Sequence, residues 1–186
     1  MASAGTASAS EPVRLYCAYT SLVDRPTFER LWEANATPAR RLPAGRRADI
    51  LDMDVAFNCP SATWGGRIAG LLPARGKRVP ALVYAIDAAD WHVLELAEEF
   101  PERVPITVRV DLEGLELRAQ AFTTRLSQST TLSQVSRTAL DIQVRGAEAA
   151  GFPPEYVARL RAAPEAESLL TPELLLGLDA AIDPPR

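Results

Sequence analysis

The sequence predicts an α+β fold, with a mixed sheet that is curved or closed into a small barrel and flanked by helices. The chain has 186 residues, of which 47% are hydrophobic, and this is enough for one domain with its own core. Patterns typical of strands dominate residues 50–122, whereas patterns typical of helices close the chain. Because strands and helices gather in different parts of the chain, an α+β fold is favoured.

The N-terminal part is expected to be a disordered lead, followed by one domain over residues 13–183 without internal repeats. Residues 1–12 are small and polar and have no periodicity. Residues 13–19 combine β-branched, aromatic and apolar side chains and lead into a polar step, so they predict a buried first strand. A short helix is expected over residues 27–36, because Pro26 precedes it and its apolar side chains share one side.

Residues 37–48 predict a solvated loop, since they contain two prolines, a glycine and four arginines. The alternative is an anion-binding patch formed by these arginines, which are Arg40, Arg41, Arg46 and Arg47.

The middle of the chain is expected to be mainly sheet. The predicted elements are strands at 53–58, 66–72 and 79–87, a helix at 87–100, and a hairpin of strands 104–110 and 115–122. Turns with proline or glycine separate the strands, including one at residues 73–76, and Pro101 stops the helix. Three further helices are expected at residues 133–150, 154–162 and 172–181.

The composition excludes several classes of function. The net charge is −4, with 24 acidic against 20 basic residues, so nucleic acid is not an expected partner. No apolar run approaches the ~20 residues of a membrane span. Residues 1–10 also lack the basic start and apolar middle of a signal peptide. We therefore expect a cytoplasmic protein that does not bind membranes.

Few side chains are available for metal or nucleophilic chemistry. His92 is the only histidine and is expected on the surface, so a site with several histidine ligands is excluded. Cys17 and Cys59 have no metal-like spacing and are expected to be reduced thiols. We expect no metal and no cofactor, and chemistry that depends on carboxylates, hydroxyls, arginines or backbone groups.

Glu98 is the carboxylate that the helical pattern singles out. At ~100° per residue, the predicted 87–100 helix has an apolar arc, and Glu98 lies inside one edge of it. The arc consists of Leu96, Phe100, Val93, Ala97, Leu94 and Trp91. Apolar neighbours disfavour a charged carboxylate and raise its pKa toward the range of a general base. The alternative is an ordinary position at the solvated margin of a surface helix.

Two further segments are candidates for binding groups. The strand end Tyr19-Thr20-Ser21 leaves backbone N–H groups that can receive a ligand carboxylate or a developing oxyanion. In Trp64-Gly65-Gly66, the glycines allow close backbone approach and the indole can form the wall of a pocket. Ordinary turns are the alternative explanation for both segments.

Four segments resemble, in the same order, the γ-glutamylcyclotransferase family over about residues 14–162. Leu15-Tyr16-Cys17-Ala18-Tyr19-Thr20-Ser21-Leu22 resembles the family's strand leading into a Tyr-Gly-Ser-Asn loop. Thr63-Trp64-Gly65-Gly66-Arg67-Ile68-Ala69 resembles a Trp- and Gly-rich segment of the glutathione-degradation type. Leu94-Glu95-Leu96-Ala97-Glu98-Glu99 is similar to the Leu-Asp-x-x-Glu-Gly signature. Gly146-Ala147, Gly151-Phe152-Pro153 and Glu155-Tyr156 with Leu160 resemble the closing Gly-Ala, Gly-Leu-Pro and Tyr-x-x-x-Leu pattern.

The resemblance implies a γ-glutamylcyclotransferase-like fold and an enzyme that releases 5-oxoproline from a γ-glutamyl amide or peptide. In this family the α-amine of the substrate attacks its own γ-carbonyl, without metal or cofactor. Glu98 maps onto the catalytic acid/base of the family signature. The implied substrate-binding residues are Tyr19, Thr20, Ser21, Leu22, Trp64 and Phe122. The oligomeric state is left open, with a homodimer as one option.

The chain departs from the family pattern in its pocket. Thr20 and Leu22 replace Gly and Asn of the loop, and Glu99 replaces the Gly after the acid. Phe122 stands where a Tyr is common, and a ligand-facing Tyr of the closing helix falls at Ala139. These changes favour an altered substrate, for example a γ-glutamyl intermediate of small-molecule biosynthesis. The alternatives are a related acyl-transfer or lactam-forming enzyme, and a non-catalytic binding protein on the same fold.

Overall fold

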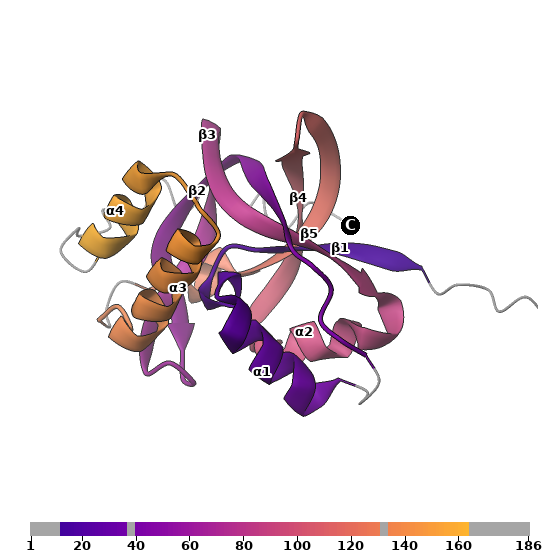
Figure 1. Cartoon of the computed structure of the whole chain (residues 1–186). Helices are drawn as coiled ribbons and strands as arrows, with labels where there is room; N and C mark the ends of the chain where they lie inside the picture. The colour runs from indigo at the N-terminus through magenta and orange to yellow at the C-terminus, as the bar shows by residue number, and fades with distance from the viewer. Residues whose placement is uncertain (1–11, 37–39, 131–133, 164–186) are drawn as a thin grey trace, which may run out of the picture.

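In the part of the chain that the structure describes, five strands form one mixed sheet that curves into a barrel (Figure 1). The computed structural model describes residues 12–36, 40–130 and 134–163. The strands are β1 (Val13–Ala18), β2 (Arg46–Ser61), β3 (Gly66–Asp87), β4 (Arg103–Leu112) and β5 (Leu115–Thr124). They lie in the order β1-β3-β2-β4-β5, and their neighbouring pairs are antiparallel. A single parallel pair, Tyr16 with Gln120, joins β1 to β5 and closes the barrel narrowly.

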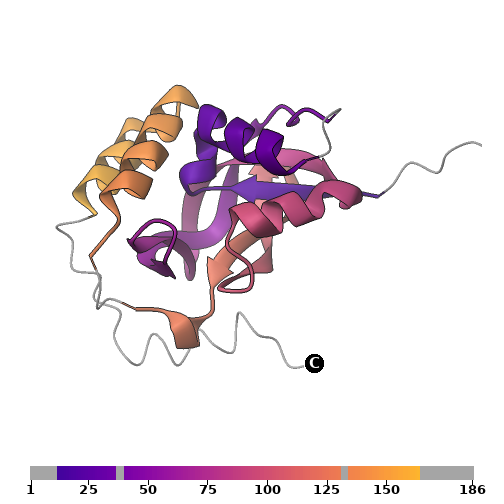
Figure 2. The same cartoon turned by 90° about the horizontal axis from the view of Figure 1, so that it is seen from below.

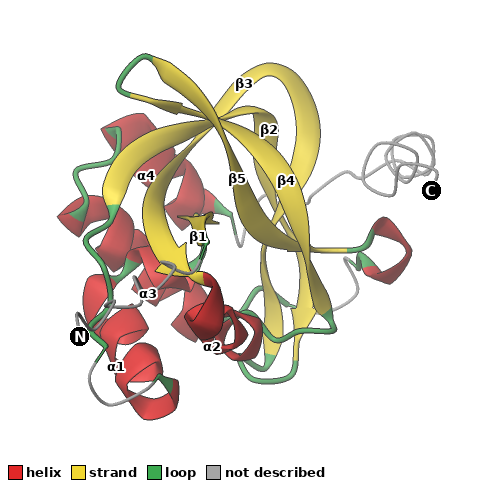
Figure 3. Cartoon of the chain, turned by 90° about the vertical axis from the view of Figure 1, so that its right-hand side faces the viewer, coloured by secondary structure: helices red, strands yellow, loops and turns green. Residues whose placement is uncertain are grey.

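Among the described residues, four α-helices flank this sheet, as the sequence predicts for an α+β fold (Figure 3). They are α1 (Arg25–Asn35), α2 (Trp91–Ala97), α3 (Arg137–Ala149) and α4 (Pro154–Ala162). Short 3-10 turns lie at η1 (Ser21–Val23), η2 (Ala88–Asp90) and η3 (Leu126–Gln128). Helix α3 packs against α4 and η1, and α1 contacts α2. Seen from below, α1 and α2 lie along β1, which brings the end of α2 to the first strand (Figure 2).

Helix α1 begins two residues before the predicted start, because Asp24 caps it. The Asp24 carboxylate accepts hydrogen bonds from the Thr27 backbone N–H at 3.1 Å and from its hydroxyl at 2.6 Å. Arg145 of α3 donates to the same carboxylate at 2.8 and 2.9 Å. Pro26 therefore lies inside the first turn, where its missing N–H costs nothing.

Strands β2 and β3 are longer than the sequence predicts. Strand β2 begins at Arg46, so Arg46 and Arg47 belong to a strand and not to the expected loop. The predicted turn at residues 73–76 is a bulge within the pair, because Leu51 pairs with Arg78 whereas Met53 pairs with Pro73. The backbone N–H of Gly76 donates to the Asp52 carboxylate at 2.7 Å and closes the bulge.

Helix α2 is shorter than the predicted 87–100 helix, and part of its predicted apolar arc is wrong. The helix ends at Ala97, and Glu99 has a φ of 58° in the left-handed region. Leu96 is 62% exposed and Phe100 is 50% exposed, although both were expected on the buried side. The helix buries Trp91, Val93 and Leu94 instead, and Trp91 stacks on Phe122 of β5.

The remaining predictions for described residues are confirmed where local signals are strong. The first strand, the hairpin and helix α4 occur as expected. Glu113 and Gly114 turn the hairpin with φ values of 55° and 85°, the geometry of a two-residue turn. Helix α3 begins at Arg137, later than the predicted 133. The predicted lead at 1–12, except Pro12, and the predicted helix at 172–181 lie outside the described residues.

The core is centred on aromatic rings inside the barrel mouth. Tyr16 packs against Phe28, Tyr84 and Phe122, with ring centroids 5.9 to 6.3 Å apart. Phe122 also stacks on Trp91 of α2 at 6.1 Å. These contacts fix β1, β3, β5 and α2 relative to one another around the position of Glu98.

Candidate active site

Glu98 is the residue immediately after α2, and its side chain is only 1% exposed. Its backbone N–H donates to the Leu94 carbonyl at 2.8 Å, so the last turn of the helix holds its position. The sequence places Glu98 within a longer helix, whereas in the structure the helix end directs its carboxylate inward. Glu98 is therefore more deeply buried than its position at the edge of the predicted apolar arc indicates.

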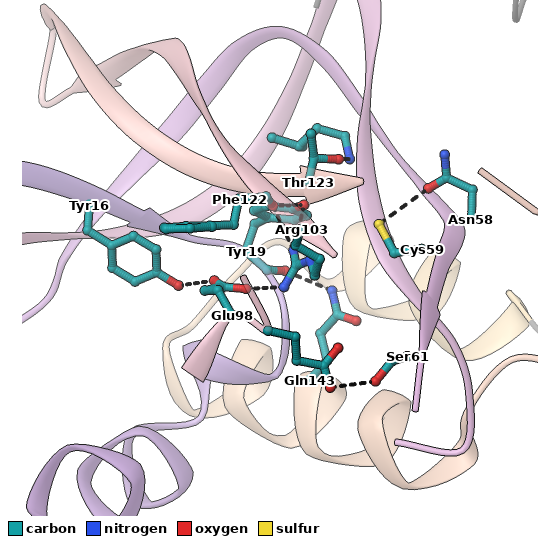
Figure 4. Close-up of polar contacts among 12 residues, drawn as sticks. Tyr16, Tyr19, Asn58, Cys59, Ser61, Glu98, Arg103, Phe122, Thr123 and Gln143 are labelled. Atoms are coloured by element: carbon teal, nitrogen blue, oxygen red, sulfur yellow. Dashed lines mark hydrogen bonds and ion pairs between the residues drawn. The ribbon is translucent and has the colours of Figure 1, made fainter. Parts of the chain in front are cut away.

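The Glu98 carboxylate is bound on both sides by buried donors (Figure 4). The Tyr16 hydroxyl, from β1, donates to one carboxylate oxygen. The Arg103 guanidinium, from the first residue of β4, donates to the other and forms an ion pair with it. The acid thus lies beside the opening strand, and its charged partner is Arg103, a residue that the sequence analysis does not single out.

Arg103 connects Glu98 to the residue that follows β1. Its Nη2 donates to the Tyr19 hydroxyl at 3.1 Å and to the Phe122 carbonyl at 2.6 Å. The Tyr19 hydroxyl also donates to the Phe122 carbonyl, at 2.6 Å. Gln143 of α3 donates to the Tyr19 carbonyl at 2.8 Å. Groups from β1, α2, β4, β5 and α3, or from the residues directly after them, therefore meet in one buried polar network, which holds Arg103 and Tyr19 in fixed orientations.

The electrostatics of this network follow from its burial. Burial raises the pKa of Glu98, and the Arg103 charge and the Tyr16 hydroxyl oppose that rise without cancelling it. Burial lowers the pKa of Arg103, but the charge of Glu98 together with smaller contributions from Tyr19, Cys59 and Tyr16 outweighs it, so the pKa is raised and the guanidinium stays charged. Burial and the Glu98 charge raise the pKa of Tyr16, which keeps its hydroxyl protonated as a donor.

The predicted loop Tyr19-Thr20-Ser21-Leu22 lies next to this network but is not open to solvent. Its side chains are buried, and Leu22 joins the main hydrophobic core. Residues 21–23 form the turn η1, whose first backbone N–H groups have no partner within the turn. Arg103 contacts both the Glu98 carboxylate and the Tyr19 hydroxyl, so protein side chains bridge Glu98 and the first residue of this loop.

Phe122 and Trp64 differ in their relation to Glu98. Phe122 is fully buried, and its ring packs against Tyr16 and Trp91 while its carbonyl joins the polar network. Trp64 lies in the turn between β2 and β3, where it packs against a small cluster of Cys59, Ile68 and Ala139. Trp64 is connected to the Glu98 region indirectly. Its backbone N–H donates to the Ser61 hydroxyl at 3.0 Å, and that hydroxyl donates to the carboxylate of Glu99, the residue after Glu98, at 2.8 Å.

Tyr16, Arg103 and Gln143 are the network residues that the sequence analysis missed. The pattern around Tyr16 predicts a strand and the pattern around Gln143 predicts a helix, and neither pattern predicts a polar contact. Arg103 follows Glu98 by five residues across a turn, and no helical or strand periodicity connects the two positions. An arginine at the first position of a strand rich in valine and isoleucine is the one local signal for its burial.

The other candidate groups have surface or structural positions. His92 is exposed, with its ring nitrogen 2.9 Å from the Ala89 carbonyl oxygen. Cys17 and Cys59 are buried free thiols. In residues 12–36, 40–130 and 134–163, no group of three His, Cys, Asp or Glu side chains is placed to hold a metal ion. Over the same ranges, every helix is too short or too polar to cross a membrane.

Comparison with known proteins matches the fold and a segment of the sequence. The model of the AIG2-like family matches residues 78–160, which contain α2, Glu98 and Arg103. No curated protein sequence matches the chain.

Several solved structures share the fold. A structure named gamma-glutamyl cyclotransferase is 22% identical, with a TM-score of 0.68 over 88% of this chain and 96% of its own. An uncharacterized protein from Homo sapiens is 24% identical, with a TM-score of 0.67 over the same shares. YkqA from Bacillus subtilis is 20% identical, with a TM-score of 0.69 over 85% of this chain and 56% of its own.

These findings agree with the resemblance that the four sequence segments carry. The segment match includes the helix end with the acid, and the fold likeness covers most of the chain. The chain therefore shares its fold with the structure named gamma-glutamyl cyclotransferase, and its residues 78–160 are similar to the AIG2-like family.

Proposed function

We propose that the protein is a γ-glutamyl cyclotransferase-like enzyme that releases 5-oxoproline from a γ-glutamyl amide or peptide. The substrate's α-nitrogen forms a bond to its own γ-carbonyl carbon, and the bond from that carbon to the leaving amine breaks. Because the attack is intramolecular, the protein has to fold the substrate, move protons and bind the charge that develops on oxygen.

The observation that carries this proposal is the position of Glu98. A carboxylate buried at the junction of β1, α2 and β4 is desolvated, and its raised pKa suits a group that both accepts and returns protons. The neighbouring acids Glu95 and Glu99 are part-exposed, and the buried Asp90 is paired with the part-exposed Arg40 at 2.8 Å.

The proton balance needs a single acid/base. The α-ammonium group loses two protons as it becomes the lactam N–H, and the leaving nitrogen gains two as it departs as an ammonium ion. Glu98 accepts the first proton to free the nucleophile and later delivers protons to the leaving nitrogen. The two protons that the α-ammonium group loses thus equal the two that the leaving amine gains, and the reaction needs no other proton source.

The loop Tyr19-Thr20-Ser21-Leu22 supplies the binding donors in this proposal. The backbone N–H groups at the start of η1 point from the end of β1, and would engage a substrate oxygen at ~2.7–3.1 Å. Trp64 and Phe122 are retained as proposed binding residues because the family pattern places them near the substrate. Their present contacts are with protein atoms.

The leaving amine, the location and the pathway are also proposals. The replaced loop residues Thr20 and Leu22 support a substrate other than glutathione, such as a γ-glutamyl intermediate of small-molecule biosynthesis in the cytoplasm. A homodimer remains a proposal for the oligomeric state.

A second candidate function is a non-catalytic binding protein on the same fold. It is favoured by the Arg103 guanidinium on the Glu98 carboxylate and by Leu22, which is 1% exposed in the core. An acid whose charge is already paired can serve stability alone. A lactam-forming or acyl-transfer enzyme with another substrate is the third possibility, since the same buried acid would serve it.

The test is turnover of a panel of γ-L-glutamyl amines and peptides, with 5-oxoproline measured by mass spectrometry. Glu98→Gln should abolish 5-oxoproline release, while Glu95→Gln, three residues earlier on the same helix, should retain it. Both variants must keep the wild-type circular dichroism spectrum. Release that persists in Glu98→Gln removes this residue from the mechanism, and an inactive wild type across the panel supports the binding protein or the altered chemistry.

A further inference from the structure

We propose that the Glu98–Arg103 ion pair is the recognition site for the zwitterionic head group of the substrate. In this inference, which rests on the proposed function, Arg103 binds the α-carboxylate and Glu98 binds the α-ammonium group of the γ-glutamyl moiety. Arg103 is then a specificity-determining residue, and the site accepts only γ-glutamyl groups whose α-carboxylate is free.

Charge balance is the first argument. Glu98 and Arg103 are 1% and 2% exposed, and together they carry no net charge. A zwitterion inserted between them also carries none, so each buried charge keeps an opposite neighbour in the free and in the bound protein. Since unpaired buried charges are strongly disfavoured, a ligand with both charges fits this pair better than one with a single charge.

The donors of Arg103 are the second argument. Its Nη2 is fixed by the Tyr19 hydroxyl and the Phe122 carbonyl, at 3.1 and 2.6 Å, so the plane of the guanidinium is held from the side of the β-sheet. Its Nε is buried and has no hydrogen-bond partner within the described chain. A buried donor without a partner is rare and costly, and a carboxylate oxygen is its strongest acceptor.

The neighbouring strand supplies a second unsatisfied group. Arg103 pairs in register with Thr124 of β5, and the Thr124 hydroxyl is also buried without a partner in the described residues. The Thr124 hydroxyl can donate a hydrogen bond to a carboxylate oxygen of a bound substrate. Without a ligand, this donor has no partner among the described residues. Two unsatisfied donors thus occur on adjacent strands at the position where the α-carboxylate is placed.

The assignment also divides the binding groups between the two ends of the substrate. With the α-carboxylate at Arg103, the backbone donors of the loop after Tyr19 remain for the oxygen of the γ-carbonyl, where negative charge develops during attack. Arg103 contacts both Glu98 and Tyr19, so it connects head-group binding to the loop.

A site built to bind a polar group rejects analogues that lack the group, because its own buried groups then stay unpaired. The first experiment is therefore calorimetric titration at pH 7 with L-glutamine, 4-aminobutanamide and glutaramate. The second compound lacks only the α-carboxylate, and the third lacks only the α-ammonium group. The wild type should bind L-glutamine about 10-fold to 100-fold more tightly than either analogue.

The variants separate recognition from folding. In Arg103→Gln, the preference for L-glutamine over 4-aminobutanamide should fall to about 3-fold or less. In Arg103→Lys, the preference should lie between those of the wild type and Arg103→Gln, because lysine keeps the charge but not the paired donors of the guanidinium. Arg109→Gln is the matched control, since this arginine is on the same strand but half-exposed. It should retain the wild-type preference. If Arg103→Gln does not fold, Arg103→Lys and the wild-type series decide the matter.

A turnover experiment distinguishes this inference from the proposed function. The wild type and Arg103→Lys are given the methylamides of γ-L-glutamate and of 4-aminobutanoate, which would cyclise to 5-oxoproline and 2-pyrrolidinone. Arg103→Lys should raise KM for the first amide only. A wild type that binds L-glutamine selectively but cyclises neither amide supports the recognition site and contradicts the cyclotransferase. Equal affinity for L-glutamine and 4-aminobutanamide, or equal losses for both in the variants, overturns the inference.

Discussion

The Arg103 guanidinium forms a buried ion pair with the carboxylate of Glu98, five residues earlier in the chain and across the turn between α2 and β4. Neither charge reaches solvent, so each depends on the other for compensation. The pair also joins two elements whose positions set the site, because α2 presents the acid and β4 presents the arginine.

Arg103→Met should reduce the free energy of unfolding by about 3–5 kcal/mol, because the buried Glu98 carboxylate loses its counter-charge. Glu98→Gln should also destabilise, since it leaves the guanidinium unpaired. The double variant should lose clearly less than the sum of the two single losses. Urea unfolding at pH 7 measures all three values.

The exposed pair Arg109 and Glu116 is the control for this cycle, with an N–O distance of 2.8 Å. Its removal should change stability by only about 0–1 kcal/mol. Additive losses at Glu98 and Arg103 would contradict a direct energetic coupling between the two side chains.

Tyr16→Phe should raise the pKa of Glu98 and lower stability by about 1–3 kcal/mol, because the acid loses its hydroxyl donor while the ring contacts remain. Carbon-13 NMR of the labelled Glu carboxyls follows the titration. Tyr84→Phe is the matched control, since the Tyr84 ring is equally buried and, among described residues, its hydroxyl lacks a partner. This control should be neutral or stabilising, and a loss as large as that of Tyr16→Phe would argue against a specific bond to Glu98.

The acid limb of the stability curve should depend on Asp24. Hydrogen bonds from Arg145 lower the pKa of Asp24, and those from Thr27 add to the effect. A carboxyl with a lowered folded pKa stabilises above its unfolded value of about 3.9, and this contribution is lost as the pH falls through the folded pKa.

Asp24→Asn should therefore destabilise by about 1–2 kcal/mol at pH 7, and the difference from wild type should shrink as the pH approaches about 2. Thermal unfolding between these pH values measures the difference. The exposed Asp141→Asn on α3 should leave the curve close to wild type. A constant difference across the pH range would mean that the charge of Asp24 does not contribute.

Gly146→Ala should destabilise the packing of α3 on the loop after β1. A Cβ at this position would lie 2.4 Å from the backbone nitrogen of Asp24 and 2.7 Å from the carbonyl carbon of Val23. Backbone on both sides leaves little room, so a loss of about 1–3 kcal/mol is expected. The intrinsic helix preference alone would give the opposite sign, because alanine exceeds glycine by about 1 kcal/mol.

Thermal unfolding of Gly146→Ala and of Thr138→Ala, an exposed position on the same helix, checks this sign. A stabilised Gly146→Ala variant would show that the helix can shift away from the loop, and the assigned close contact would be wrong.

Local sequence patterns were sufficient for the elements that form from neighbouring residues. The strand at 13–18, the hairpin with Glu113 and Gly114 at its turn, and helix α4 all carry their signals within a few residues. Local patterns were insufficient where hydrogen bonds between strands override the local preference for a turn. Strands β2 and β3 continue past the proline- and glycine-containing segment at 73–76, since backbone hydrogen bonds on both sides of a bulge maintain the ladder.

By itself, the sequence determined the fold class, the resemblance to the γ-glutamylcyclotransferase family and the choice of Glu98 as the acid to examine. Only the tertiary structure decided how that acid is held, because its partners come from positions that periodicity does not connect. Tyr16 is 82 residues away from Glu98, and Arg103 lies beyond a turn on another strand. The burial of a charge depends on which elements close around it, and that is a property of long-range packing.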